Sequence, residues 1–166
     1  MGKPDMNDEQ IPEASVIPSL RFLYTSLVKV DAPLMAGHAP YGERRIINIT
    51  GGAFSGPRLS GHVLPGGADW QIIRNDGIVE VEARYTLQTH DGSLIYVTNR
   101  GLRHGPKEVM ERLASGEVVD PSEYYFRTTP IFETGSPDYK WLNGLVAIAA
   151  GERRADHVII TVYEVT

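Results

Sequence analysis

The sequence contains no cysteine among its 166 residues. This absence excludes disulfide bonds, thiolate metal sites, iron–sulfur clusters and cysteine nucleophiles. The chain also lacks any apolar run that approaches the roughly 20 residues of a helix that crosses a bilayer. Basic residues are in the minority, 16 against 21 acidic ones. Because binding to phosphates requires clustered lysine and arginine, and no such cluster is present, the charge argues against nucleic acid and anionic membranes as partners.

The remaining composition is that of one ordinary folded domain. Hydrophobic residues make up 42% and charged residues 22% of a chain that is long enough to bury a core. Residues 1–15 carry charged side chains and no apolar segment, so they do not have the pattern of a signal peptide. We expect a frayed leader over residues 1–15, a single domain over residues 16–166, and a cytoplasmic protein.

The clearest local pattern is the alternation of apolar and polar residues over residues 78–88, which predicts a strand with two faces. The apolar face carries Val79, Val81, Ala83, Tyr85 and Leu87, and Arg84 belongs to the polar face. Asp91 and Gly92 follow, and Asp-Gly is a strong signal for a hairpin turn. Residues 94–103 are rich in β-forming residues and provide the returning strand.

Other segments with β-branched residues, bounded by turn-forming residues, indicate further strands. They are residues 21–30, 44–50, 59–64, 70–74, 124–134, 145–150 and 157–165. One helix is expected over residues 106–115, with proline near its start and glycine after its end. A shorter turn is expected over residues 137–142. About eight or nine strands joined by short turns favour an all-β fold, an antiparallel closed or nearly closed β-barrel with one short helix.

Several motifs of well-known chemistry are missing from the chain. The glycine-rich residues 51–57 lack the lysine and the following helix of a phosphate-binding loop, which favours a bulged strand or a sheet corner. The five histidines show no recognised metal spacing, and no serine lies in a nucleophile elbow. We therefore expect neither a metal nor a cofactor.

Asp69 and Trp70 adjoin a tight turn at the start of a predicted strand, a place that lies near the mouth of a barrel. A buried aspartate there would have a raised pKa, which suits general acid–base chemistry, and tryptophan would supply a flat apolar wall. The alternative is structural: Asp69 caps the turn through its own backbone while Trp70 packs in the core. The sequence leaves both interpretations open.

Arginines among aromatic residues form a second candidate site. Arg84 precedes Tyr85, and Arg127 lies in a run of aromatic residues that is followed by Glu133. Such arginines suit the binding of a carboxylate or of a planar ligand, although an internal arginine–glutamate ion pair would serve structure alone. Further along the chain, three residues either line a mouth or form a packed turn: Tyr139, Trp141 and Asn143.

Taken together, these stretches resemble the bacterial and fungal family known as domain of unknown function 3237. The matching segments are residues 42–45, 49–57, 64–71, 83–87, 91–92, 124–128, 132–134 and 139–143, among them the strings Gly-Gly-Ala-Asp-Trp-Gln and Tyr-Phe-Arg-Thr. The resemblance implies a small β-barrel of lipocalin-like or allene-oxide-cyclase-like shape. It implies little about activity, because a fold does not determine a function.

The leading hypothesis is a barrel enzyme that uses acid–base chemistry on a small organic substrate, such as an isomerase, cyclase, dehydratase or hydrolase. Asp69 and Glu133 would be its catalytic carboxylates, and Arg84 and Arg127 would hold an anionic group or stabilise an oxyanion. The pocket walls would be Trp70, Tyr85 and Trp141. The alternatives are a barrel that binds a small ligand without catalysis, and a structural or assembly subunit. A homo-oligomer is also compatible with the sequence, which sets no subunit number.

Overall fold

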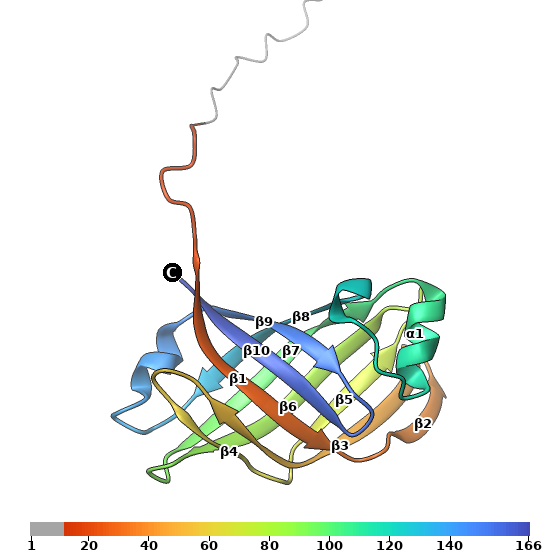
Figure 1. The fold of residues 1–166 in the computed structure, drawn as a ribbon, viewed down its shortest axis with the longest axis horizontal. Coiled ribbons are helices and arrows are strands. Elements are labelled where there is room, and N and C mark those ends of the chain that lie inside the picture. The colour runs from red at the N-terminus through yellow and green to blue at the C-terminus, as the bar shows by residue number, and fades with distance from the viewer. Residues whose placement is uncertain (1–11) are drawn as a thin grey trace, which may run out of the picture.

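The computed structural model describes residues 12–166, in which ten strands form one antiparallel sheet (Figure 1). Most of the predicted leader, residues 1–15, lies outside the described residues. The strands are β1 (Leu20–Val30), β2 (Leu34–Ala39), β3 (Gly42–Ser55), β4 (Ser60–Val63), β5 (Ala68–Ile73), β6 (Val79–Thr89), β7 (Leu94–His104), β8 (Tyr125–Glu133), β9 (Ala147–Arg153) and β10 (His157–Val165). The helical elements are α1 (Lys107–Ala114) and two 3₁₀ turns, η1 (Pro121–Glu123) and η2 (Lys140–Gly144).

The sheet closes on itself as an eight-strand barrel, because two pairs of strands each act as one. Strand β2 continues the line of β1 along one side of β3, and β5 continues the line of β4 along the other side. From β6 onward each strand pairs with the next in the chain, and β1 pairs with both β3 and β10. The predicted closed antiparallel β-barrel with one short helix is therefore confirmed.

The predicted hairpin of residues 78–103 is confirmed as β6 and β7, which pair along almost their whole length. Gly92 has a φ of 87°, a conformation that glycine adopts without strain. The Asp91 carboxylate accepts hydrogen bonds from the Thr89 hydroxyl and from the Ser93 backbone N–H, the latter at 3.0 Å. The local turn chemistry thus fixes the register of this hairpin.

The glycine pair in β3 allows two strands to approach closely where the barrel closes. Gly52 faces Val28 of β1 and has a φ of 141°. A Cβ atom at Gly52 would lie 2.0 Å from the Leu27 carbonyl oxygen, a distance that no side chain tolerates. The glycine-rich segment therefore serves close packing of the backbone, which is the interpretation that the sequence favoured over a phosphate site.

The two ends of the barrel interior differ in chemistry. Toward η2 the interior is filled by apolar side chains, and the Tyr24 ring packs edge-on against Phe54 and Phe132 at centroid distances of 5.4 and 6.2 Å. At the other end α1 lies over the mouth, beside β2 and the start of β3 (Figure 1). The interior at the α1 end is hollow, and polar side chains line part of it.

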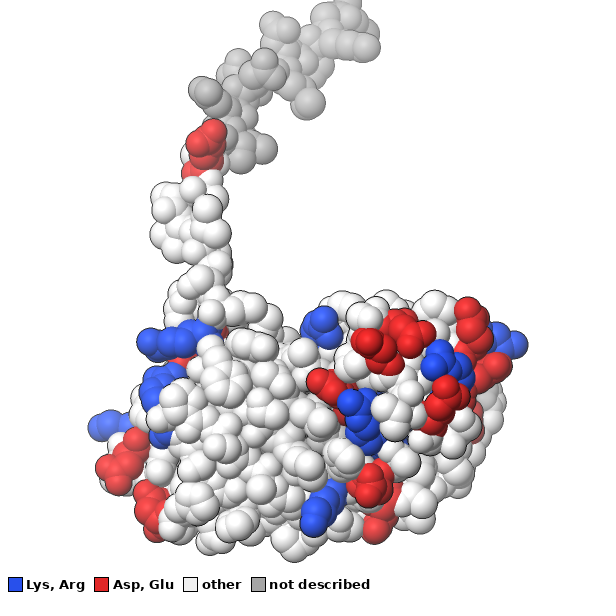
Figure 2. Space-filling view, in the orientation of Figure 1, with Lys and Arg blue, Asp and Glu red and all other residues white. Residues whose placement is uncertain are grey.

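Charged side chains gather toward the ends of the barrel, whereas the face over β1 and β10 shows few of them (Figure 2). At the α1 end both signs occur, and Arg112 pairs with Glu117 and Glu123 at 2.9 and 3.2 Å. The surface at the α1 end is therefore of mixed charge and not a basic patch. None of the helices within residues 12–166 combines the length and the hydropathy of a membrane-crossing segment.

Candidate functional site

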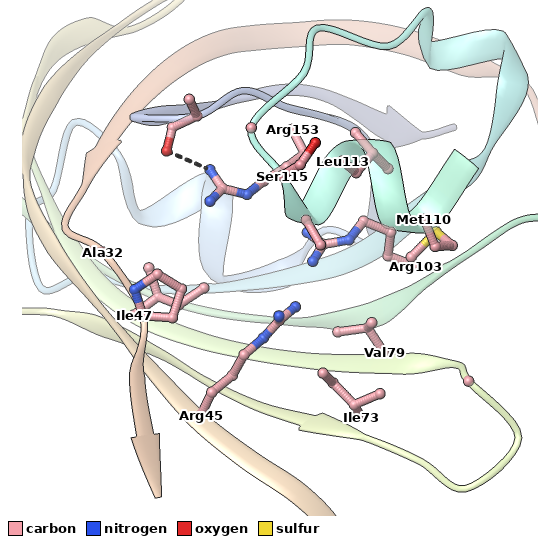
Figure 3. Close-up of a pocket in the computed structure, with 15 residues that line it drawn as sticks. Ala32, Arg45, Ile47, Ile73, Val79, Arg103, Met110, Leu113, Ser115 and Arg153 are labelled. Atoms are coloured by element: carbon pink, nitrogen blue, oxygen red, sulfur yellow. Dashed lines mark hydrogen bonds between the residues drawn. The ribbon is translucent and has the colours of Figure 1, made fainter. Parts of the chain in front are cut away.

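Two adjoining cavities occupy the α1 end of the barrel. The outer one, the mouth cavity, has a volume of about 310 Å³ and lies between α1 and the strand ends (Figure 3). The inner one, the inner cavity, has a volume of about 50 Å³ and lies deeper between the strands. Ile47, Arg103 and Arg153 line both cavities, so the two cavities adjoin at these three side chains. Ligand pockets are commonly about 300–1,000 Å³, so the mouth cavity has the volume of a small-molecule pocket.

Asp69 supplies the carboxylate of the inner cavity. It lies on β5, where alternation turns its side chain inward, and two donors hold the carboxylate. The Gln71 amide donates to Oδ2 at 2.6 Å, and the backbone N–H of Glu82 donates to Oδ1 at 2.9 Å. Burial raises the pKa of Asp69, although both hydrogen bonds and the charges of Arg103 and Arg45 act in the opposite direction. Asp69 therefore takes up a proton at a higher pH than an exposed aspartate.

Three arginines surround this single carboxylate: Arg45 from β3, Arg103 from β7 and Arg153 from β9. Arg45 and Arg103 converge on the mouth cavity, and Arg153 lines it from the opposite wall (Figure 3). Arg45 donates through Nε to the Gln71 side chain at 2.7 Å, so a chain of hydrogen bonds links Arg45 to Asp69 through Gln71. Arg153 donates to the backbone carbonyls of Arg154 and Ala155.

Arg103 is the most deeply buried of the three, with 4% of its surface exposed. Its Nε has no hydrogen-bond partner among the described residues, and its guanidinium carbon lies 5.2 Å from the centroid of the Phe126 ring. Burial, followed by repulsion from Arg45 and Arg153, lowers the pKa of Arg103 to about 10. Burial likewise lowers the pKa of Arg45 and of Arg153. The fold thus holds an excess of positive charge in a poorly solvated place.

Neutral polar groups complete the inner wall. Within residues 12–166, the hydroxyl of Tyr85 and the Oδ1 atom of Asn99 are buried without a hydrogen-bond partner. Both side chains line the inner cavity beside Asp69 and Arg103. Burial raises the pKa of Tyr85, so its hydroxyl stays protonated and able to donate at neutral pH. Unpaired buried polar groups that face a cavity are available to a ligand.

Of the residues that the sequence singled out, the structure brings Asp69 and Tyr85 together in the lumen. Trp70 directly follows Asp69 in β5, and Arg84 directly precedes Tyr85 in β6. Because neighbours in a strand face opposite sides, the side chains of Trp70 and Arg84 turn to the outer face. Trp70 is 40% exposed, and Arg84 pairs with Glu82 at 2.7 Å on the surface. They cannot wall the cavity that Asp69 and Tyr85 line.

Arg127 and Glu133 also lie outside the barrel, on the exposed phase of β8. Arg127 donates to the Phe126 carbonyl at 2.9 Å, and its guanidinium lies 5.4 Å from the centroid of the Tyr125 ring. Glu133 sits at the η2 end of β8, away from the cavities. The structure therefore does not bring Glu133 to Asp69 as a second carboxylate.

The candidates near η2 form a packed turn at the end of the barrel opposite the cavities. Trp141 donates through Nε1 to the Asp138 carbonyl at 3.1 Å and is covered by the Arg58 guanidinium, 4.1 Å from the ring centroid. Asn143 exchanges two hydrogen bonds of 2.9 Å with the backbone of Thr134. The Tyr139 backbone caps the same turn. These residues hold the β8–β9 connection and do not line the mouth.

Five polar lumen residues were not predicted from the sequence: Arg45, Gln71, Asn99, Arg103 and Arg153. A signal for two of them is present in β7, where the inward phase begins with Ile95 and Val97 and continues with Asn99 and Arg103. A polar residue on the apolar phase of a strand marks either a filled polar interior or a site. Among residues 12–166 no group of three or more His, Asp or Glu side chains is arranged to hold a metal ion.

Comparison with known proteins identifies a family whose model matches this chain and a relative that is named as an enzyme. A family model described as "Protein of unknown function (DUF3237)" matches residues 18–165. A UPF0311 protein of Rhodopseudomonas palustris (strain TIE-1) is 46% identical over 145 residues, which cover 87% of this chain and 95% of that protein. A crystal structure of a conserved protein of unknown function from the same species has a TM-score of 0.87 at 42% identity, over 92% of this chain and 100% of that one. The hydroalkoxylation enzyme phnH of Penicillium herquei is 27% identical over 130 residues, 78% of this chain and 72% of the enzyme.

Proposed function

Since this chain belongs to the family described as protein of unknown function (DUF3237), we propose a function from the lumen itself: an enzyme that moves protons to and from a small organic molecule bound at the α1 end of the barrel. Asp69 is the general acid and base. The observation that carries the proposal is the placement of this carboxylate, held by two donors in the inner cavity that adjoins the mouth cavity.

The surroundings of Asp69 suit proton transfer in two respects. Burial raises its pKa, which brings the protonated and ionised forms closer in free energy at neutral pH than in an exposed aspartate. The Gln71 amide occupies one lone pair of Oδ2, and the Glu82 N–H occupies one lone pair of Oδ1. Each carboxylate oxygen therefore keeps another lone pair for a ligand. The carboxylate is thus oriented without being saturated.

The arginines supply positive charge where such chemistry develops negative charge. Removal of a proton next to a carbonyl group leaves negative charge on an oxygen, and donors that are already in place stabilise that charge. Arg103 has unused donor capacity beside Asp69, and the Tyr85 hydroxyl offers a neutral donor on the same wall. Both groups are fixed in strands, which limits the reorganisation that the reaction requires.

The distant relative named as a hydroalkoxylation enzyme supports this class of reaction. Hydroalkoxylation adds an alcohol across a carbon–carbon double bond: the O–H bond breaks, the oxygen bonds to one carbon, and a proton bonds to the other. A carboxylate that accepts the hydroxyl proton and returns it to carbon performs both proton transfers in turn. This reaction needs neither an oxidant nor a reductant, and it fits one carboxyl group beside a cationic donor.

Exchange of hydrogen for deuterium tests proton transfer without knowledge of the natural substrate. The protein is incubated in heavy water with phenylpyruvate, levulinate and 2-tetralone, and the loss of C–H signals next to each carbonyl is followed by NMR. We expect acceleration above the buffer rate, and a reduction of about 100-fold or more in Asp69→Asn. The matched control is Asp138→Asn, which makes the same change on an exposed side chain near η2.

Two outcomes would count against the enzyme. Undiminished exchange in Asp69→Asn would remove this carboxyl group from the reaction. Binding of a ligand in the mouth cavity without exchange of any probe would favour the alternative function, a barrel that binds a small molecule without catalysis, for which a cavity of about 310 Å³ is sufficient.

A further inference from the structure

We infer that the lumen binds an organic monocarboxylate head-inward, with its carboxylate on Arg103 at the junction of the two cavities and its apolar body in the mouth cavity. This inference names the ligand class of the site and rests on the proposed function only in placing the ligand in the lumen. Its argument depends on charge, on the size of the inner cavity and on the walls of the mouth.

The charge balance of the lumen calls for an anion. Three arginines and one carboxylate line the two cavities, and none of the three arginines belongs to an ion pair of residues 12–166. Arg45 and Arg153 have hydrogen-bond acceptors in the protein, whereas Arg103 is 96% buried and its Nε has none. A buried cation that makes no direct ion pair is costly, and an anionic ligand supplies a partner in contact with it.

The inner cavity sets the size of the anionic group. Its volume of about 50 Å³ is about one sixth of that of the mouth cavity, so only a small group fits there. A carboxylate fits this space and matches the planar guanidinium of Arg103 through two parallel hydrogen bonds. A phosphate dianion is larger and doubly charged, so Asp69, which lines the same cavity, repels it more strongly than a singly charged carboxylate. The geometry therefore favours a singly charged, planar head group.

The mouth cavity determines the rest of the ligand. Beside the three arginines, its walls carry Ile47, Ile73 and Val79 from the strands, and Met110 and Leu113 from α1 (Figure 3). These side chains offer dispersion contacts and few hydrogen bonds, which suits a hydrocarbon or aromatic body. Methionine in particular adapts to ligands of irregular shape. A carboxylate inside and an apolar body outside together make the ligand amphiphilic.

The probes are 2-naphthoate and its neutral analogue 2-naphthamide, with binding measured by calorimetry at pH 7. We expect the carboxylate to bind about tenfold or more tightly than the amide, and inorganic phosphate not to compete with it. Arg103→Met should weaken the binding of 2-naphthoate by roughly 10- to 100-fold and the binding of 2-naphthamide much less. Arg100→Met is the control, because Arg100 lies on the same strand with its side chain on the outer face.

Several results would overturn the inference: equal affinity for the two probes, displacement of 2-naphthoate by phosphate, unchanged affinity in Arg103→Met, or no binding of 2-naphthoate at millimolar concentration. The comparison of the two probes uses the wild-type protein, so the test does not depend on the folding of a variant. Asp69→Asn separates the two proposals, since it should keep or strengthen 2-naphthoate binding while it reduces deuterium exchange by about 100-fold or more. Retained exchange with carboxylate-selective binding refutes the proposed function alone, and lost exchange without carboxylate selectivity refutes this inference alone.

Discussion

Replacement of Arg103 by methionine should stabilise the unliganded protein, although it removes a charged side chain. Arg103 is 4% exposed, and burial together with the charges of Arg45 and Arg153 lowers its pKa to about 10. At pH 7 the residue is charged in the folded and in the unfolded protein. The pKa of Arg103 is lower in the folded protein than in the unfolded chain, so the protonated side chain destabilises the folded state. This cost is present in full at every pH below about 10.

The size of the effect follows from that difference. A fall from the ordinary value of 12.5 to about 10 corresponds to about 3 kcal/mol, at about 1.4 kcal/mol per tenfold change in acidity. Methionine keeps the apolar stem but loses the guanidinium contact with Phe126, a contact of about 0.5–1 kcal/mol. We therefore expect a net increase of about 1–3 kcal/mol in the free energy of unfolding. For a chain of this length, about 1 kcal/mol corresponds to a rise of roughly 2–4 °C in Tm.

The assay is urea denaturation at pH 7 in a buffer that contains no carboxylate, followed by tryptophan fluorescence and circular dichroism. Arg100→Met is again the control: Arg100 pairs with Glu82 at 2.8 Å on the surface, and its loss should lower the free energy of unfolding by less than about 1 kcal/mol. If Arg103→Met is less stable than the wild type by more than about 1 kcal/mol, the guanidinium is paired in the native fold. The argument for an unbalanced charge in the lumen would then be wrong.

Two further predictions concern Asp69 and the β6–β7 hairpin. Burial raises the pKa of Asp69 in the folded protein above the ordinary value of 3.8. The folded protein therefore binds this proton more tightly than the unfolded chain does. The contribution of Asp69 to stability falls as the pH rises from 3.8 to the pKa of the folded state. Asp69→Asn should therefore lose less stability than the wild type between pH 4 and pH 7, and equal slopes in urea denaturation would contradict this. Gly92→Ala should lower the free energy of unfolding by about 1 kcal/mol or more, because its φ of 87° strains any side chain. Gly135→Ala, a site with no neighbour within 4 Å of a new Cβ, should change it by less than about 0.5 kcal/mol, and a cost as large as that of Gly92→Ala would refute the turn argument.

The parts of the fold that the sequence predicts are those that local chemistry determines. Alternation over residues 78–88 and the Asp91–Gly92 turn specify the β6–β7 hairpin without help from the rest of the chain. The helix α1 follows from Pro106 and from the spacing of its apolar residues. The continuation of β1 by β2 and of β4 by β5 is not visible in the sequence, because it depends on the pairing of both with β3.

The lumen was harder to predict, because alternation defines two faces of a strand but does not say which one is inside. In β8 both phases mix aromatic and polar residues, and the phase with Arg127 and Glu133 proved to be the outer one. One constraint was available in the sequence: neighbours in a strand face opposite sides. Asp69 and Trp70 therefore could not share a pocket, nor could Arg84 and Tyr85.

The contrast between the two ends of the barrel ties stability to binding. At the η2 end the interior is closed by apolar packing around Tyr24, and the same strands could have been filled in this way at the α1 end. Instead the chain places Arg45, Arg103 and Arg153 there beside one carboxylate, an arrangement that we expect to weaken the fold. Residues that cost stability without a structural benefit concentrate at functional sites. The two effects of Arg103→Met should therefore appear together: the variant gains stability in the absence of ligand and loses the additional stabilisation that 2-naphthoate gives to the wild type.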